Sequence, residues 1–174
     1  MRKFRIVPVI LLAAVLVSGC GSNPYKEGME QLEAGNYKKA GASFKQSVEK
    51  GKHTADAYRG LGMALWEQKD YEGARDALAD SVKEGGKKNG TICNLLGSCE
   101  LELKNYDDAV KYYKEALTDD KNSKELMQEI EYNLIVSYEG AQNWDKAREN
   151  LEKYIKKYPD DKKAVKEQQF LETR

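Results

Sequence analysis

The chain has 174 residues, of which 33% are charged and 40% apolar, with three prolines and a formal net charge of zero. This length is enough for one domain of ordinary size, and the composition is typical of a helical protein without long apolar runs beyond its N-terminus. No basic excess or basic stripe argues for nucleic acid as a partner.

The first 19 residues have the layout of a secretory signal peptide. Residues 1–5 are basic, residues 6–17 are apolar, and the small residues Ser18 and Gly19 come directly before Cys20. An apolar run of this length is shorter than the ~20 residues that a membrane-spanning helix needs. The pattern therefore predicts a signal peptide over residues 1–19. Its removal leaves 29 acidic and 26 basic residues, a net charge of about −3.

Residues 17–20 (VSGC) resemble the bacterial lipobox. The resemblance implies that Cys20 receives a diacylglyceryl group and anchors the chain to the extracytoplasmic face of a bacterial membrane. Gly21, and not Asp, follows this cysteine, which implies that an outer membrane is a possible destination if the organism has one. An ordinary signal peptide with a coincidental cysteine, or a cytosolic start, are the alternatives. Residues 20–23 would form the anchor and a linker, and three extended residues reach about 10 Å.

From residue 24 onward the sequence repeats with a nearly constant period. Gly28, Gly62 and Gly97 follow one another at 34 and 35 residues. The same spacing recurs among four alanines, with a longer last interval of 38 residues: Ala40, Ala74, Ala109 and Ala147. A fixed period in this range predicts a repeat architecture.

Each repeat is predicted to form two amphipathic helices joined by a tight turn. In the clearest unit, Leu61 and Leu65 share one stripe, and Tyr71, Ala74 and Leu78 share another, at the spacing of buried helix faces. The predicted units are residues 24–53, 54–88, 89–121 and 122–159. A C-terminal capping helix is predicted over residues 160–174, with one side made of Ala164, Val165, Gln168 and Leu171.

Polar residues at the helix starts are predicted to act as N-caps. Asn23 precedes a proline at the first helical position, and Thr54 and Asp70 hold the corresponding places in the second unit. Asn122 and Glu125 have the spacing of a capping box.

These features resemble the tetratricopeptide repeat (TPR) family. The family pattern of an aromatic residue, an alanine and a large residue in the second helix occurs in four units: Tyr37, Ala40 and Phe44; Tyr71, Ala74 and Leu78; Tyr106, Ala109 and Tyr113; and Trp144, Ala147 and Leu151. The chain departs from the family at Ile135, where a small residue is usual, and keeps the terminal proline only as Pro159. The resemblance implies an all-α fold, a right-handed α-solenoid of about four TPR helix pairs plus the capping helix.

Residues that could carry chemistry are sparse. The one histidine, His53, falls in a predicted loop and has no other ligand at helix-face spacing, so no metal site is predicted. Cys93 and Cys99 lie six residues apart on one predicted helix, about 9 Å along its axis, which is too far for a disulfide between them. They are predicted to be buried packing thiols, with an intermolecular disulfide as the alternative. The sequence predicts no catalytic residues, no cofactor and no enzyme.

The first helix of each unit has a second stripe that the packing stripe does not use. In the second unit this stripe is Arg59, Met63 and Trp66, about 110–120° from the packing residues. In TPR arrays such positions line a concave groove, and Met, Trp and Arg are common anchors for partners. Shielding of neighbouring helices is the alternative role. The predicted groove residues are Tyr25, Met29, Arg59, Met63, Trp66, Asn94, Ser98, Leu101 and Tyr132.

Together these features predict a membrane-anchored TPR lipoprotein that acts as a scaffold or adaptor for a peptide or protein. The groove would hold the partner, the lipid on Cys20 would hold the membrane, and no nucleic acid would bind. A lipoprotein that binds a small molecule or a glycan is the alternative.

Overall fold

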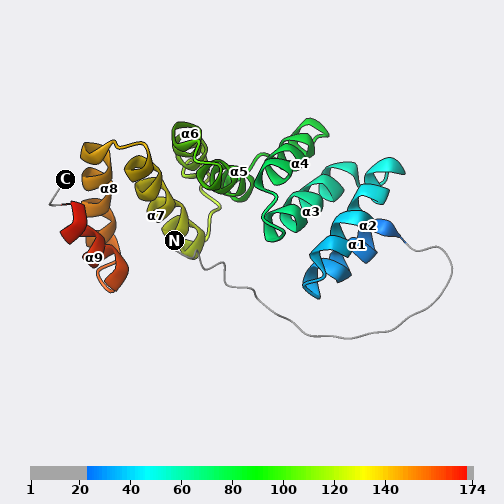
Figure 1. The fold of residues 1–174 in the computed structure, drawn as a ribbon, viewed down its shortest axis with the longest axis horizontal. Coiled ribbons are helices and arrows are strands. Elements are labelled where there is room, and N and C mark those ends of the chain that lie inside the picture. The colour runs from blue at the N-terminus through cyan, green and yellow to red at the C-terminus, as the bar shows by residue number, and fades with distance from the viewer. Residues whose placement is uncertain (1–22, 172–174) are drawn as a thin grey trace.

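The computed structural model describes residues 23–171, and within this range the chain folds into nine α-helices and no strands (Figure 1). The predicted all-α repeat fold is confirmed. The helices are α1 (Pro24–Glu33), α2 (Tyr37–Glu49), α3 (Thr54–Glu67), α4 (Tyr71–Lys83), α5 (Gly90–Glu102), α6 (Tyr106–Ala116), α7 (Lys124–Gly140), α8 (Trp144–Lys157) and α9 (Lys162–Leu171).

The helices form an elongated row in which each packs mainly against the next, from α1 at one end to α9 at the other (Figure 1). Two pairs of odd-numbered helices also make contact, α1 with α3 and α5 with α7. No two even-numbered helices within residues 23–171 make comparable contact. Adjacent pairs therefore approach more closely on the odd-numbered side. In a curved stack of repeats the closer side is the concave one, so the odd-numbered helices line the inner face.

The turn inside each helix pair has the same construction. One residue in each turn is left-handed, with φ of 74°, 64°, 64° and 57° at Gly35, Lys69, Lys104 and Gln142 respectively. The next backbone N–H donates to the carbonyl five residues earlier, at 2.8–3.0 Å in all four turns. This is the Schellman closure of a helix C-terminus, and it fixes the angle at which the second helix returns along the first.

Two predicted N-caps are confirmed. The Asn23 side chain accepts a hydrogen bond from the backbone N–H of Tyr25 at 3.1 Å, ahead of a proline at the first helical position. Asp70 accepts from the backbone N–H of Gly73 at 3.0 Å. Each bond satisfies a donor that the helix itself leaves unpaired.

Two other predicted caps are wrong by one position. Helix α3 already begins at Thr54, and His53 occupies the N-cap in a left-handed conformation without a side-chain bond. At the start of α7, Ser123 accepts the capping bond from a backbone N–H of the first turn. Asn122 does not cap, because its side-chain amide donates to the carbonyl of Ala116 at the end of the preceding pair.

The first two helix pairs close around Phe44 of α2, which is fully buried. A glycine faces its ring from each side, Gly28 on α1 and Gly60 on α3. A Cβ at either position would lie within 2.7 Å of ring atoms, closer than carbon atoms pack. The absence of side chains at these two positions thus allows three helices to share one aromatic ring.

The C-terminal helix α9 covers the end of the array with a different stripe from the predicted one. Ala164 and Leu171 are buried in the core, as expected, but Val165 is 40% exposed and Glu167 is buried in its place. The spacing of residues 164, 167 and 171 follows one helix face, whereas residue 165 lies about 100° from residue 164. Sequence hydrophobicity favoured the valine over the glutamate.

None of the helices within residues 23–171 is long and apolar enough to cross a membrane. The predicted signal peptide and Cys20 lie outside the described residues.

Candidate functional site

The inner face of α3 presents an exposed cation beside an exposed thioether. The Arg59 side chain is 46% exposed and lies 3.1 Å from the Asp56 carboxylate one turn earlier. Met63, one turn later, is 40% exposed, and is among the few large apolar side chains so exposed in the described part of the chain. Residues four apart on a helix are neighbours, so the two side chains form one surface. An exposed ion pair of this type adds little stability, which leaves Arg59 available to a partner.

Trp66, the third predicted groove residue of α3, is already partly engaged. Its ring lies 4.9 Å from that of Tyr71 at the start of α4. It also packs against the cluster that joins α4 to α5, which contains Leu78 and Leu96. Trp66 therefore contributes to the seam between the second and third pairs, and only part of its ring is open to solvent.

On α1, the predicted groove residues Tyr25 and Met29 are also partly buried. The Tyr25 ring lies 6.1 Å from Phe44 and stacks on His53 at 4.8 Å. Met29 packs against the core of the first two pairs. Both side chains thus support the terminal pair as well as facing the inner side.

The predicted groove positions of α5 are the least accessible. Asn94 is 4% exposed, and its side-chain amide donates to the Glu129 carboxylate of α7 at 2.8 Å. Leu101 is 8% exposed, and Ser98 is partly buried with its hydroxyl 3.0 Å from that of Tyr113. The Asn94–Glu129 bond connects the third pair to the fourth, whereas the Ser98–Tyr113 contact lies within the third pair.

The hydroxyl of Tyr113 remains protonated at ordinary pH. Burial raises its pKa well above the usual value, and either hydroxyl can be the donor in its hydrogen bond with Ser98. The Asn94 carbonyl oxygen, in the same region, is buried and has no hydrogen-bond partner among the described residues. The inner side of α5 is therefore polar but largely closed.

Tyr132, the predicted groove residue of α7, is partly buried and packs with its ring 5.6 Å from Tyr154 of α8. Across the nine predicted positions outside Cys20, the structure leaves Arg59 and Met63 exposed and shows the other seven partly or fully buried. Contact with a partner stays a prediction for all nine.

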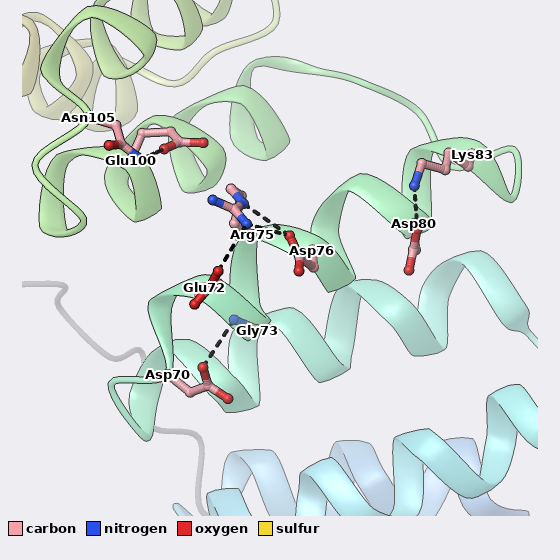
Figure 2. Close-up of polar contacts among 9 residues, drawn as sticks. All are labelled: Asp70, Glu72, Gly73, Arg75, Asp76, Asp80, Lys83, Glu100 and Asn105. Atoms are coloured by element: carbon pink, nitrogen blue, oxygen red, sulfur yellow. Dashed lines mark hydrogen bonds and ion pairs between the residues drawn. The ribbon is translucent and has the colours of Figure 1, made fainter.

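A separate polar cluster lies on α4 and at the end of α5 (Figure 2). Arg75 of α4 lies 2.8 Å from Asp76 and 3.8 Å from Glu72. Its pKa is raised, first by the hydrogen bond to Asp76 and further by neighbours that include Glu100 of α5. The buried Glu100 carboxylate accepts a hydrogen bond from Asn105 at 2.7 Å. A buried carboxylate requires such partners, so this cluster is explained by packing between α4 and α5.

The remaining candidates for chemistry do not assemble. Cys93 and Cys99 are 1% and 0% exposed, as the prediction of packing thiols requires. His53 is exposed in a loop and stacks on Tyr25. Within residues 23–171 no group of three or more His, Cys, Asp or Glu side chains is placed to hold a metal ion.

The Asn94–Glu129 bond is the inner-face feature that sequence analysis missed. The two residues are 35 positions apart, close to the repeat period, and Glu129 lies three residues before Tyr132, the α7 position that matches Asn94. That spacing was the available signal. It identifies residues on adjacent inner helices, although it does not determine which of them bond.

Two models of the tetratricopeptide repeat family match the chain, one over residues 25–89 and one over residues 100–167. Together they cover most of the described residues. No curated protein matches the chain at a significant level.

Several solved structures have a similar fold at low sequence identity. MamA from Desulfovibrio magneticus RS-1, from residue 41 to its end, is 19% identical with a TM-score of 0.76, and the match covers 90% of this chain and 87% of that one. MamA AMB-1 is 17% identical with a TM-score of 0.71, covering 85% and 78% of the two chains. YrrB, described as a TPR protein with an unusual peptide-binding site, is 20% identical with a TM-score of 0.57, covering 84% and 90%.

Proposed function

This chain belongs to the tetratricopeptide repeat family, and from that premise we propose that it is a lipid-anchored scaffold that binds a peptide or protein on its inner face. Family membership and the fold support a role in protein–protein interaction. The specific partner site is our proposal, as are the membrane anchor and a role without catalysis.

The observation that carries the partner site is the exposed pair Arg59 and Met63 on α3. Polar bonds and core contacts occupy the equivalent positions on α5, whereas the Arg59 side chain is 46% exposed with an exposed ion pair to Asp56, and Met63 is 40% exposed. Arg and Met are residue types that protein interfaces favour. YrrB, a structural neighbour, is a peptide-binding TPR protein by its description, which supports a peptide or an extended protein segment as the ligand.

The anchor would place this scaffold on the extracytoplasmic side of a bacterial membrane. Its support is the sequence of residues 17–20 and the short linker, residues 21–23, between Cys20 and helix α1. A diacylglyceryl group with a further acyl chain would hold the protein stably, whereas one chain alone gives marginal attachment.

A site-specific crosslink tests the partner site. A photoreactive amino acid at Met63 in the full chain, expressed in its own cells, should give a defined crosslinked product. The same residue at Glu152, an exposed position on α8, should not give that product. Arg59→Glu should weaken capture about tenfold, as expected for an interface anchor.

The matched control for Arg59→Glu is Lys111→Glu on α6. Lys111 forms an equivalent exposed ion pair with the aspartate three residues earlier, at 2.7 Å. Both substitutions reverse one charge in such a pair, so their effects on folding should be similar. Equal capture by the two variants would refute the proposed site.

Cell fractionation of Cys20→Ala tests the anchor. The wild-type chain should be recovered with membranes and resist extraction by high salt, whereas Cys20→Ala should be released or accumulate as an uncleaved precursor. A variant that is cleaved normally and still resists salt extraction would contradict lipid anchoring through this residue.

A further inference from the structure

Helix α2 and the loop after it carry a concentration of lysines that the balanced charge of the whole chain conceals. Residues 37–52 contain five lysines and a single acidic residue, Glu49. The corresponding residues 71–84 around α4 contain four acidic and two basic residues. The excess of positive charge is therefore not shared by every repeat, and it is larger around α2 than in α8, whose residues 144–157 contain five basic and three acidic residues. We call its side chains the lysine face: Lys38, Lys39, Lys45, Lys50 and Lys52.

The lysine face is exposed and its charges are uncompensated. All five side chains are exposed, while the opposite side of α2 buries residues such as Phe44 and Ser47. At 100° per residue, Lys38 and Lys45 lie about 20° apart, and Lys39 and Lys50 follow about 100–120° around the helix. No ion pair within residues 23–171 involves any of the five, in contrast to Lys111, Lys146 and other lysines of the outer helices.

This face lies at the end of the array that leads to the anchor. The Tyr25 ring at the start of α1 contacts Phe44 in the second half of α2 and stacks on His53 just beyond it. Lys45, Lys50 and Lys52 belong to that same end of the helix pair. Cys20 precedes the first described residue by three positions, a reach of about 10 Å.

We propose that the lysine face of α2 docks on the anionic lipid headgroups of the membrane that holds Cys20. The inference rests on the proposed anchor, which would keep the face within reach of headgroups and make contact effectively intramolecular. Each lysine held near an anionic surface strengthens binding roughly fivefold. The rest of the chain is net acidic and would be repelled, so docking orients the array.

The orientation has a functional consequence. The lysine face is on the outer side of the first pair, opposite the inner face that carries Arg59 and Met63. Docking through α2 would turn the inner face of the first two pairs away from the lipid and toward a partner arriving from the aqueous side.

A thiol probe on the lysine face tests the docking in the lipidated full chain. Ala42 is exposed between the lysines, and Ala42→Cys introduces the probe there. Cys93 and Cys99 are buried and react slowly by comparison, and the lipid would block Cys20. The protein is produced in a host that processes lipoproteins, its intact mass is measured, and it is reconstituted on vesicles of phosphatidylcholine with or without phosphatidylglycerol.

The readout is the rate of modification by a neutral, water-soluble maleimide. We expect the rate at Ala42→Cys to fall on the order of tenfold on vesicles that contain phosphatidylglycerol. It should recover at 1 M salt, where the Debye length is about 3 Å. A probe at Glu152→Cys on α8 should react equally on both vesicle types.

Charge removal supplies the matched controls. Lys38→Gln, Lys45→Gln and Lys50→Gln together should abolish the protection, whereas the same change at Lys156, Lys163 and Lys166, which are exposed at the other end of the array, should preserve it. Equal rates on both vesicles for protein with the lipidated mass would overturn the docking and leave the anchor intact. A mass without lipid would refute the anchor, and the docking with it. If protection of Ala42→Cys from the maleimide depended on an added acidic protein and not on the lipid, the docking on lipid headgroups would also be overturned.

Discussion

Gly60→Ala tests how closely the first two helix pairs pack around Phe44. The added Cβ would lie within 2.7 Å of three atoms of the ring, whereas carbon atoms prefer separations of about 3.5–4.0 Å. The ring has little freedom to move toward α1, because a Cβ position at Gly28 already lies 2.7 Å from two of its atoms on that side. Overpacking of this kind lowers stability by about 1–3 kcal/mol. The higher helix propensity of alanine relative to glycine raises stability by about 1 kcal/mol.

The net expectation is a loss of about 0–2 kcal/mol in the free energy of unfolding, measured by urea denaturation with circular dichroism. Gly41→Ala on α2 is the matched control. The Cβ there would meet its nearest neighbours at 3.7 Å, an ordinary contact, so helix propensity alone should stabilise the protein by up to about 1 kcal/mol.

A double-mutant cycle separates the clash from other effects. In a Phe44→Leu background, Gly60→Ala should become neutral or stabilising, because the shorter side chain vacates the space that the Cβ needs. The expected coupling energy is about 1–3 kcal/mol. If the two changes were additive within ~0.5 kcal/mol, or if Gly60→Ala stabilised the wild type as Gly41→Ala does, the close approach of α3 to this ring would be refuted.

Three further changes probe the rest of the array. Burial raises the pKa of Cys93 to about 11 and that of Cys99 to about 12, so stability should be constant up to about pH 9, the usual thiol range, and fall as the pH rises toward 11–12. In thermal melts across this pH range, the melting temperature of Cys99→Ala should fall less steeply with pH than that of the wild type. Glu129→Ala leaves the buried amide of Asn94 unpaired and should cost about 1–3 kcal/mol in urea denaturation, which Glu129→Gln should largely avoid. Lys104→Gly should raise the urea midpoint, because the left-handed conformation of Lys104 costs a non-glycine residue about 1–2 kcal/mol, a gain that the greater freedom of glycine in the unfolded chain partly offsets.

The helices and their order could be predicted because their signals are local. Small residues at a fixed period, an aromatic residue after each turn and apolar stripes at helix spacing all act within one pair, and the nine observed helices follow them. The left-handed turn residues also recur at the repeat period, but only Gly35 is of a residue type that favours this conformation. Lys69, Lys104 and Gln142 have no sequence preference for it, so the shared turn geometry appears only in the structure.

The candidate site could be predicted only in part, because it depends on how neighbouring pairs are placed. Arg59 and Asn94 occupy equivalent positions in successive units, yet Arg59 is exposed and Asn94 is buried, with 4% of its surface exposed. The difference arises because α7 approaches α5 and supplies Glu129, whereas α5 makes no comparable approach to α3. Helix periodicity places both residues on the inner side and cannot distinguish these two environments.

This unequal use of the inner face bears on where a partner would bind. A groove position that is bonded to the next pair must lose that bond before it contacts a ligand, and the loss of a buried hydrogen bond costs about 1–3 kcal/mol. Arg59 and Met63 carry no such cost, since an exposed ion pair contributes little. The energetically favoured footprint of a partner is therefore the inner side of the first two pairs. The lysine face lies on the outer side of the first pair, so the surface proposed for the membrane and the surface proposed for the partner are on opposite sides of the array.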